Sequence, residues 1–190
     1  MDKIIIPTVS RRTFFRGAGT LSAATIAMLA GVKIAKAAGA PAADVGILNV
    51  ALGLEHEAIN AYQLGAQSNL LQKPVLDVAV LFQSHHKAHR DALVSTIQKL
   101  GGTPVAEKKL EEYAKSLKAD TLKTQTDVLE LAAKLELGAT NAYLGVIPSF
   151  KDPNLAKVAA RLAADETSHW TILNDALGRQ PTQKALSFGA

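Results

Sequence analysis

The sequence predicts an all-α protein, a four-helix bundle with a long crossover between its second and third helices. Ala and Leu dominate a composition that is 48% hydrophobic but only 5% aromatic, which favours packed helices over sheet. Four segments place apolar residues three and four positions apart, as amphipathic helices do, and no segment alternates as a strand would. The 190 residues suit one domain with a sizeable core.

Residues 1–37 have the features of an export signal. The segment 10–15, with its two adjacent arginines, resembles a twin-arginine signal, and small residues at 35–37 predict cleavage after Ala37. The apolar run 17–32 is shorter than the roughly 20 residues that span a bilayer, so no stable membrane span is expected after cleavage. The alternative is an amphipathic or membrane-anchoring N-terminal segment. The prediction is a periplasmic or otherwise exported protein.

The basic pI of 9.3 comes from this leader. Residues 1–37 hold six Lys and Arg against one acid, whereas residues 38–190 hold 15 against 16. Nucleic-acid binding needs a basic patch, so no nucleic-acid partner is expected. The sequence contains no cysteine, which excludes thiolate metal sites, iron–sulfur clusters, disulfides and cysteine nucleophiles.

The four expected helices form one bundle domain over residues 38–178, and a loop-like tail is expected over 179–190. From their apolar periodicity the helices span 44–70, 75–100, 121–147 and 152–178. All four are long enough to cross the same core, which predicts a single bundle.

Glycine and proline mark the ends of these helices. The segment 101–104, Gly-Gly-Thr-Pro, follows the second helix, and Pro148 ends the third. Asp152 and Pro153 provide a cap and a favoured first residue for the fourth helix. Roughly 20 residues, with a short helix expected over 107–117, separate the second helix from the third. Antiparallel neighbours need only short loops, so this length predicts a crossover along the bundle.

The chain also contains an internal repeat. Residues 54–62 and 135–143 are identical at six of nine positions, at a constant offset of 81. The helix after each copy carries two polar residues three positions apart, at an offset of 80; these pairs are His86 with His89 and Glu166 with His169. The repeat predicts two copies of one helical hairpin, related by a pseudo-twofold axis.

Three glutamates, Glu55, Glu136 and Glu166, lie inside apolar stripes, where an unpaired charge is costly. No Lys or Arg falls on the same faces, so a metal ion is the expected partner. Counted from each hairpin's turn at about 1.5 Å per residue, the polar residues of both hairpins reach mid-bundle height. The i, i+3 spacing puts both members of each pair on one helix face. These side chains are therefore expected to converge in the core.

A Glu on each of two helices, with an acid and a His three apart on each of the other two, is the carboxylate-bridged di-iron or di-manganese pattern of helical bundles. With its Leu-Glu…Ala-Tyr helix, the segment 44–178 resembles the ferritin-like superfamily, particularly exported bacterial ferritin-like domain proteins. The resemblance implies two iron ions per chain, with manganese or zinc as alternatives. The predicted metal ligands are Glu55, His86, His89, Glu136, Glu166 and His169.

One position departs from this pattern, because His86 stands where the family has Glu. The site then has three Glu and three His, which lowers its negative charge and favours one metal over two, zinc over iron, or a mixed pair. His85, four residues before His89, is an alternative ligand to His86. Tyr62 and Tyr143 each follow a core Glu by seven residues, and they either pack as aromatics, which is favoured, or hydrogen-bond the ligands.

Three neighbouring residues are expected to lie outside the site. Trp170 follows His169 directly, so it points to another face and is expected to pack or to form an interface. His56 and Glu57 lie off the core stripe and are expected to be solvated.

Three functions fit these observations. The first is a di-iron oxidase or peroxidase-type oxidoreductase, whose partners are metal ions with dioxygen or peroxide. The second is iron handling or storage. Storage needs an oligomeric shell, and the assembly expected is a homodimer or a larger homo-oligomer. The third is a non-catalytic envelope stress or binding protein with a structural or degenerate site for zinc or a single ion. The departure at His86 favours the third over a strict copy of the family's oxidase chemistry.

Overall fold

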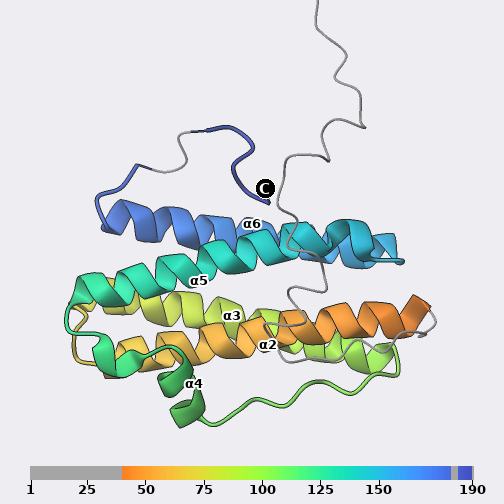
Figure 1. Cartoon of the computed structure of the whole chain (residues 1–190), viewed down its shortest axis with the longest axis horizontal. Coiled ribbons are helices and arrows are strands. Elements are labelled where there is room, and N and C mark those ends of the chain that lie inside the picture. Colours follow the sequence, from red (N-terminus) through yellow and green to blue (C-terminus); the bar gives the residue numbers. More distant parts are fainter. Residues whose placement is uncertain (1–39, 181–183, 190) are drawn as a thin grey trace, which may run out of the picture.

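The computed structural model describes residues 40–180 and 184–189 (Figure 1). The predicted export signal and its cleavage site after Ala37 lie outside the described residues. Within the described part the chain is helical with no strand, which confirms the all-α prediction. None of the helices in this part is long and apolar enough to cross a membrane.

Four long helices and three short ones follow one another over the described residues. The long helices are α2 (Ala40–Gln67), α3 (Lys73–Lys99), α5 (Gln125–Val146) and α6 (Pro153–Ala176). The short elements are α4 (Leu110–Ser116) and the 3₁₀ turns η2 (Ala119–Thr121) and η3 (Ile147–Ser149). The predicted helices are all present, with ends shifted by a few residues.

The start of α5 shows how such a shift arises. Apolar periodicity predicts a helix from residue 121, but η2 occupies that position. The Thr124 side chain accepts a hydrogen bond from the Asp127 amide, and the Asp127 carboxylate accepts one from the Thr124 amide. This reciprocal capping box satisfies the first free amides of α5 and fixes its start at Gln125.

The long helices form two antiparallel hairpins, α2–α3 and α5–α6, that lie against each other as two layers (Figure 1). The segment between α3 and α5 runs back along the bundle, as predicted, so α2 and α5 are antiparallel neighbours. At the far end, the Asp44 carboxylate accepts hydrogen bonds from the amides of Lys151 and Asp152. These bonds join the start of α2 to the α5–α6 turn.

The crossover is fastened to one face of α2. Asn49 donates to the Thr103 carbonyl and accepts from the Val105 amide. His56, predicted to be solvated, is instead only 5% exposed, and its Nε2 lies 3.3 Å from the Val105 carbonyl oxygen. The prediction was wrong because helix periodicity does not reveal that a connecting segment covers this face. Glu57 beside it is half-buried.

Two apolar clusters fill the bundle on either side of its middle. The first lies toward the α5–α6 turn and includes Leu48, Leu52, Leu93, Ile97, Leu155 and Leu162. The second lies toward the α2–α3 turn and includes Tyr62, Ala79, Phe82, Leu129, Ala133 and Leu173. Trp170 packs against this second cluster and meets Phe188 of the tail edge-on at 5.2 Å between ring centroids. Packing, one of its two predicted roles, is thus confirmed.

Two glycines offer a matched test of how the crossover docks. A Cβ on Gly102, just after α3, would lie 2.5 Å from Cγ1 and 3.0 Å from Cγ2 of Val45 on α2. Because valine is branched and stiff, we expect Gly102→Ala to lower the free energy of unfolding by about 1–3 kcal/mol. A Cβ on Gly53, inside α2, meets nothing within 4 Å. Gly53→Ala should therefore raise stability by about 0.5–1 kcal/mol. Urea unfolding of both variants checks the pair, and equal effects would contradict the close docking.

Candidate metal centre

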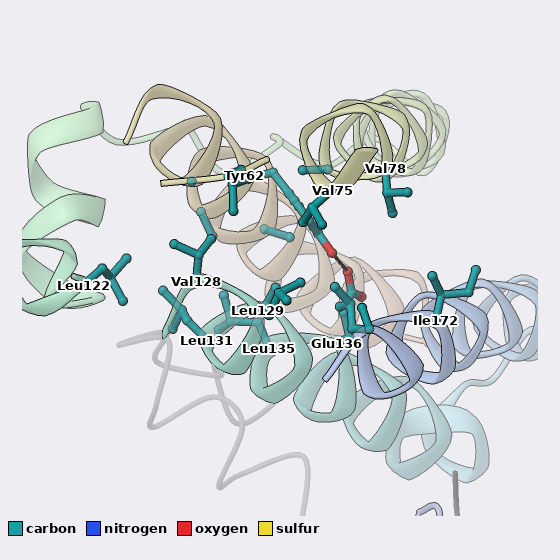
Figure 2. Close-up of a pocket in the computed structure, with 18 of the residues that line it drawn as sticks. Tyr62, Val75, Val78, Leu122, Val128, Leu129, Leu131, Leu135, Glu136 and Ile172 are labelled. Carbon is teal, nitrogen blue, oxygen red and sulfur yellow. Dashed lines mark hydrogen bonds between the residues drawn. The ribbon is translucent and has the colours of Figure 1, made fainter. Parts of the chain in front are cut away.

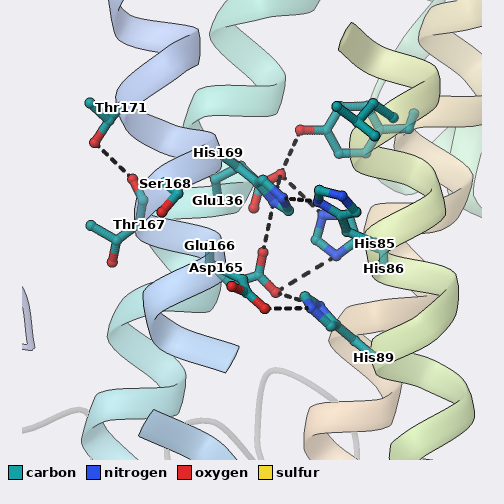
Figure 3. A network of polar contacts seen from close by, with 12 residues as sticks. His85, His86, His89, Glu136, Asp165, Glu166, Thr167, Ser168, His169 and Thr171 are labelled. Carbon is teal, nitrogen blue, oxygen red and sulfur yellow. Dashed lines mark hydrogen bonds and ion pairs between the residues drawn. The ribbon is translucent and has the colours of Figure 1, made fainter. Parts of the chain in front are cut away.

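Six polar side chains meet in the middle of the bundle, between the two apolar clusters. Figure 3 shows the α3 side chains facing those of α6 across the gap between the two hairpins. Each residue is 8% exposed or less, so all six are buried. The residues are Glu55 from α2, His86 and His89 from α3, Glu136 from α5, and Glu166 and His169 from α6. The structure therefore brings together all six residues that the sequence singles out.

The six side chains form two overlapping groups, each of which could hold a metal ion. In each group one ligand-type atom per residue lies within 4.8 Å of the others. The groups are Glu55, His86, His89 and Glu166, and His86, Glu136, Glu166 and His169. Glu166 belongs to both, because its Oε1 lies 3.2 Å from His89 Nδ1 and its Oε2 lies 3.1 Å from His169 Nδ1. A carboxylate placed in this way can bridge two cations.

His86, which stands where the resemblance implies Glu, also belongs to both groups. Its Nδ1 lies 2.8 Å from Glu55 Oε2, and its Nε2 lies 3.1 Å from Glu136 Oε1. The imidazole ring therefore stands between the carboxylates of α2 and α5. Because it has two opposed nitrogens where a Glu would have two adjacent oxygens, it cannot span a pair of cations as a carboxylate does.

Several buried atoms of these residues have no hydrogen-bond partner, although buried polar atoms nearly always have one. In the described part of the chain they include Nδ1 of His89, Nδ1 of His169, Oε2 of Glu136 and both carboxylate oxygens of Glu166. Imidazole nitrogens and carboxylate oxygens are the ligands that iron, manganese and zinc accept. The chemistry of this donor set therefore fits a divalent transition metal.

The two tyrosines hold the glutamates of the opposite hairpin. The Tyr62 hydroxyl donates to Glu136 Oε1 at 2.5 Å, and the Tyr143 hydroxyl donates to Glu55 Oε1. Packing was the favoured prediction for both tyrosines, and both rings are indeed buried, but the alternative also holds because each hydroxyl bonds a candidate ligand. This crossed arrangement is the one expected if the predicted pseudo-twofold axis relates the two hairpins.

A second layer of contacts orients the histidines. His89 Nε2 lies 3.2 Å from Asp165 Oδ2, and His169 Nε2 lies 2.9 Å from His85 Nδ1 (Figure 3). His85 thus lies behind His169 and belongs to neither of the two groups that could hold a metal ion. It does not take the place of His86 as a candidate ligand. A partner on the far nitrogen fixes the ring of a metal-binding histidine.

Sequence reasoning missed two residues of this centre. Asp165 stands at the position equivalent to His85, at the repeat's offset of 80, so the repeat itself could have identified it. Thr140, one turn after Glu136, is fully buried and its hydroxyl has no partner among the described residues. Its counterpart in the first copy is Ile59, so no signal in the sequence pointed to Thr140.

Ionic pairing outweighs burial in setting the charges of the centre. Burial alone raises the pKa of a carboxyl group, yet the hydrogen bond with His86 and the nearby imidazole of His89 lower the pKa of Glu55 to about 2. The pKa of Glu136 is lowered in the same way, with His169 as the main partner. Burial likewise opposes the charged imidazoles, but the glutamates raise the pKa of His86 to about 11 and that of His89 to about 10. Carboxylates and imidazoles thus stabilise one another's charges.

The hydroxyls and His85 behave as neutral groups around these charges. Burial, followed by the negative charge of the glutamates, raises the pKa of Tyr62 and of Tyr143 well above the ordinary value. Both tyrosines therefore keep their protons and act as donors. Burial and the charge on His169 lower the pKa of His85, which leaves it neutral and able to accept from His169.

These pKa shifts determine how stability should depend on pH once metal is chelated. A protonated imidazole with a raised pKa contributes fully below its unfolded-state pKa of about 6.5, and the contribution is lost as pH rises toward the folded-state value. We therefore expect the Tm in chelator to fall between about pH 6.5 and pH 10. On the acid side, Glu55 contributes stability above about pH 4.5 that is lost as pH falls toward 2.

Calorimetry of the full chain with and without metal checks this expectation. With saturating divalent metal the trend above pH 6.5 should reverse, because imidazole must lose its proton to bind a cation. His86→Gln removes the histidine with the highest pKa and should flatten the fall in chelator. A chelated protein whose Tm rises from pH 6.5 to pH 10 would contradict the pairing.

Comparisons with known proteins agree with this arrangement. The model of the ferritin-like domain family matches residues 43–179, which include all six residues of the centre. A comparison with curated proteins finds no match. The crystal structure of a conserved hypothetical protein, rv2844, from Mycobacterium tuberculosis is similar, with a TM-score of 0.61 and 21% identity over 78% of this chain and 99% of that chain. This degree of identity shows a common fold alone. Because the family model matches most of the chain, the protein belongs to the ferritin-like domain family.

Proposed function

We propose that this chain is an exported ferritin-like metal-binding protein with a dinuclear iron or manganese site, acting in iron oxidation and handling or in peroxide and oxygen chemistry. One observation carries the proposal. Two metal-type groups overlap in the core and share Glu166, whose two oxygens face different histidines. The resemblance of the leader to a twin-arginine signal supports export, since that route carries folded proteins.

Each half of the centre would hold one ion. Glu55 and His89 would serve the first ion and Glu136 and His169 the second, with Glu166 between them. Two adjacent iron or manganese ions supply the electrons that reduce dioxygen or peroxide. The chain itself positions the ligands and excludes water from the core.

The second layer of contacts has a defined part in this proposal. The hydroxyls of Tyr62 and Tyr143 hold one oxygen of Glu136 and one of Glu55. The other oxygen of Glu136 has no partner among the described residues, whereas the other oxygen of Glu55 contacts His86 Nδ1, which a cation would have to displace. Asp165 and His85 fix the rings of His89 and His169 with Nδ1 turned inward. This bracing presets the geometry, so metal binding costs little reorganisation.

The position of His86 supports a second candidate function. Its ring fills the space between Glu55 and Glu136, where a bridging carboxylate would otherwise lie. A centre of this kind suits a single ion or zinc, and the protein would then be a non-catalytic envelope stress or binding protein. Bound metal without turnover of Fe(II) by dioxygen or peroxide would favour this second function.

Counting metals per chain tests the proposal. We expect about two iron or manganese atoms per chain in protein purified after native export, measured by mass spectrometry. The double variant Glu136→Ala/His169→Ala removes two donors of one group and should lose at least one of the two ions. The matched control Lys134→Ala/Ser168→Ala changes exposed residues of the same two helices and should keep both.

The count also separates the two candidate functions. One zinc per chain would favour the structural or degenerate site, and His86→Glu should then raise the count to two by restoring a bridging carboxylate. No metal in the wild-type protein would overturn the dinuclear proposal.

Asp165 provides a subtler test, because its carboxylate touches the far nitrogen of His89 and no candidate metal position. We expect Asp165→Ala to weaken metal affinity about 10- to 100-fold through loss of this contact. Ser168→Ala, three residues away on the exposed face of α6, is the control and should leave affinity unchanged. Competition with a chromophoric chelator measures both variants. Equal affinities in the two would show that Asp165 plays no part in positioning His89.

A further inference from the structure

A cavity of about 230 Å³ lies beside the candidate metal centre, at the end of the bundle that holds the α2–α3 turn (Figure 2). Residues from all four long helices line it, together with Leu122 from the crossover. Aliphatic side chains make up most of the wall, including Val75, Val78, Val128, Leu129, Leu135 and Leu173. Its polar lining residues are Tyr62 and Glu136, which belong to the centre.

Small residues leave this space between the hairpins. Ala58, Ala61 and Gly65 on α2 and Ala132 on α5 line the cavity and carry little or no side chain. A Cβ on Gly65 would already lie 3.0 Å from Val128 Cγ1, so the backbones approach closely at one edge of the space. Protein interiors are usually packed with few voids larger than a water molecule, so a cavity of this size needs an explanation.

The way out of the cavity passes α6. Ile172 and Ala176 both line the cavity and are exposed, Ile172 by 47%. Both lie in the C-terminal half of α6, and Pro74 at the start of α3 also lines the cavity and is exposed, which places the mouth between α3 and α6. The cavity thus has an outer end at the surface and an inner end at Tyr62 and Glu136.

We propose that this cavity binds a linear aliphatic chain of about nine carbon atoms. An apolar cavity of about 150 Å³ holds benzene, with its six carbons, and scaling by volume to about 230 Å³ gives about nine. A lining of aliphatic side chains offers a chain contacts along its length without leaving polar groups unpaired.

The other occupants of such a space fit the walls poorly. Water needs two to four polar partners, and an apolar cavity of this kind stays dry. A helix is about 10–12 Å across with its side chains, so neither a helical segment of this chain nor one of a second copy can enter. A small apolar molecule remains as the occupant that matches both size and chemistry.

The proposal that the cavity binds an aliphatic chain rests on its volume and its lining. Its use as a substrate pocket rests in addition on the proposed function. A chain that fills it would end beside Tyr62 and Glu136. An aliphatic compound would then be the substrate class that the centre meets, in addition to iron and oxygen species.

Isothermal titration of the full chain with linear primary alcohols, from butanol to dodecanol, tests the proposal. Burying each methylene group should raise the affinity about fourfold, and the rise should stop near nine carbons, where the cavity is full. Absence of binding would overturn the proposal. So would an affinity that keeps rising through dodecanol, since that is adsorption to an open surface.

Substitutions at and away from the cavity test whether the alcohols bind inside it. Ala132→Leu puts about three further carbons inside and should shorten the longest well-bound chain by about three carbons. Ala176→Leu narrows the mouth and should weaken nonanol binding at least tenfold. Because Ala176 is exposed, the larger side chain does not disturb the packing of the core. Ala160→Leu makes the same change at an exposed position of α6 outside the cavity and should bind as the wild type does. Equal binding by the Ala176 and Ala160 variants would overturn the proposal, even if Ala132→Leu fails to fold.

Metal counts on the same samples keep the two proposals apart. Alcohol binding with the chain-length limit in a protein without metal would support the cavity and leave the proposed function without its centre. Bound metal with no alcohol binding would overturn the cavity and leave the metal centre standing.

Discussion

Three carboxylates and three imidazoles share a core with almost no exposure, and each charge there is tolerated only because another lies beside it. Burial disfavours both charged forms, yet the contacts between the glutamates and the histidines lower the pKa values of Glu55 and Glu136 and raise that of His86. The apolar clusters on either side keep water away and so strengthen this pairing. The bundle is therefore built around a polar centre that it must either neutralise internally or fill with cations.

The two hairpins support this centre symmetrically but do not contribute equally to it. The tyrosine–glutamate bonds cross between the copies in the same way, whereas α6 provides Asp165 and Glu166 at the positions where α3 provides His85 and His86. One side of the centre is thus acidic and the other basic at equivalent positions. An exact repeat would carry the same residue types on both sides, so the two halves of the centre differ in charge at these positions.

Periodicity and the repeat predicted the bundle, the crossover and the convergence of the six core residues, because all of these follow from helix geometry. Burial of His56 could not be predicted in this way, since it depends on where a segment some 50 residues away docks. The tyrosine hydroxyls find partners on the opposite hairpin, a relation between helices that spacing within one helix does not contain. The cavity depends on summed side-chain volumes, for which a linear sequence gives no measure.

Tyr62 joins the cavity to the centre. Its ring lines the cavity, stacks on His86 at 5.5 Å between ring centroids and meets Phe82 edge-on at 6.1 Å. Its hydroxyl holds Glu136. A molecule in the cavity would press on Tyr62, which touches both His86 and Glu136, so its presence would restrict the movement of these two side chains. Because packed interiors transmit small displacements rather than absorb them, occupancy of the cavity and geometry of the centre are mechanically linked through this side chain.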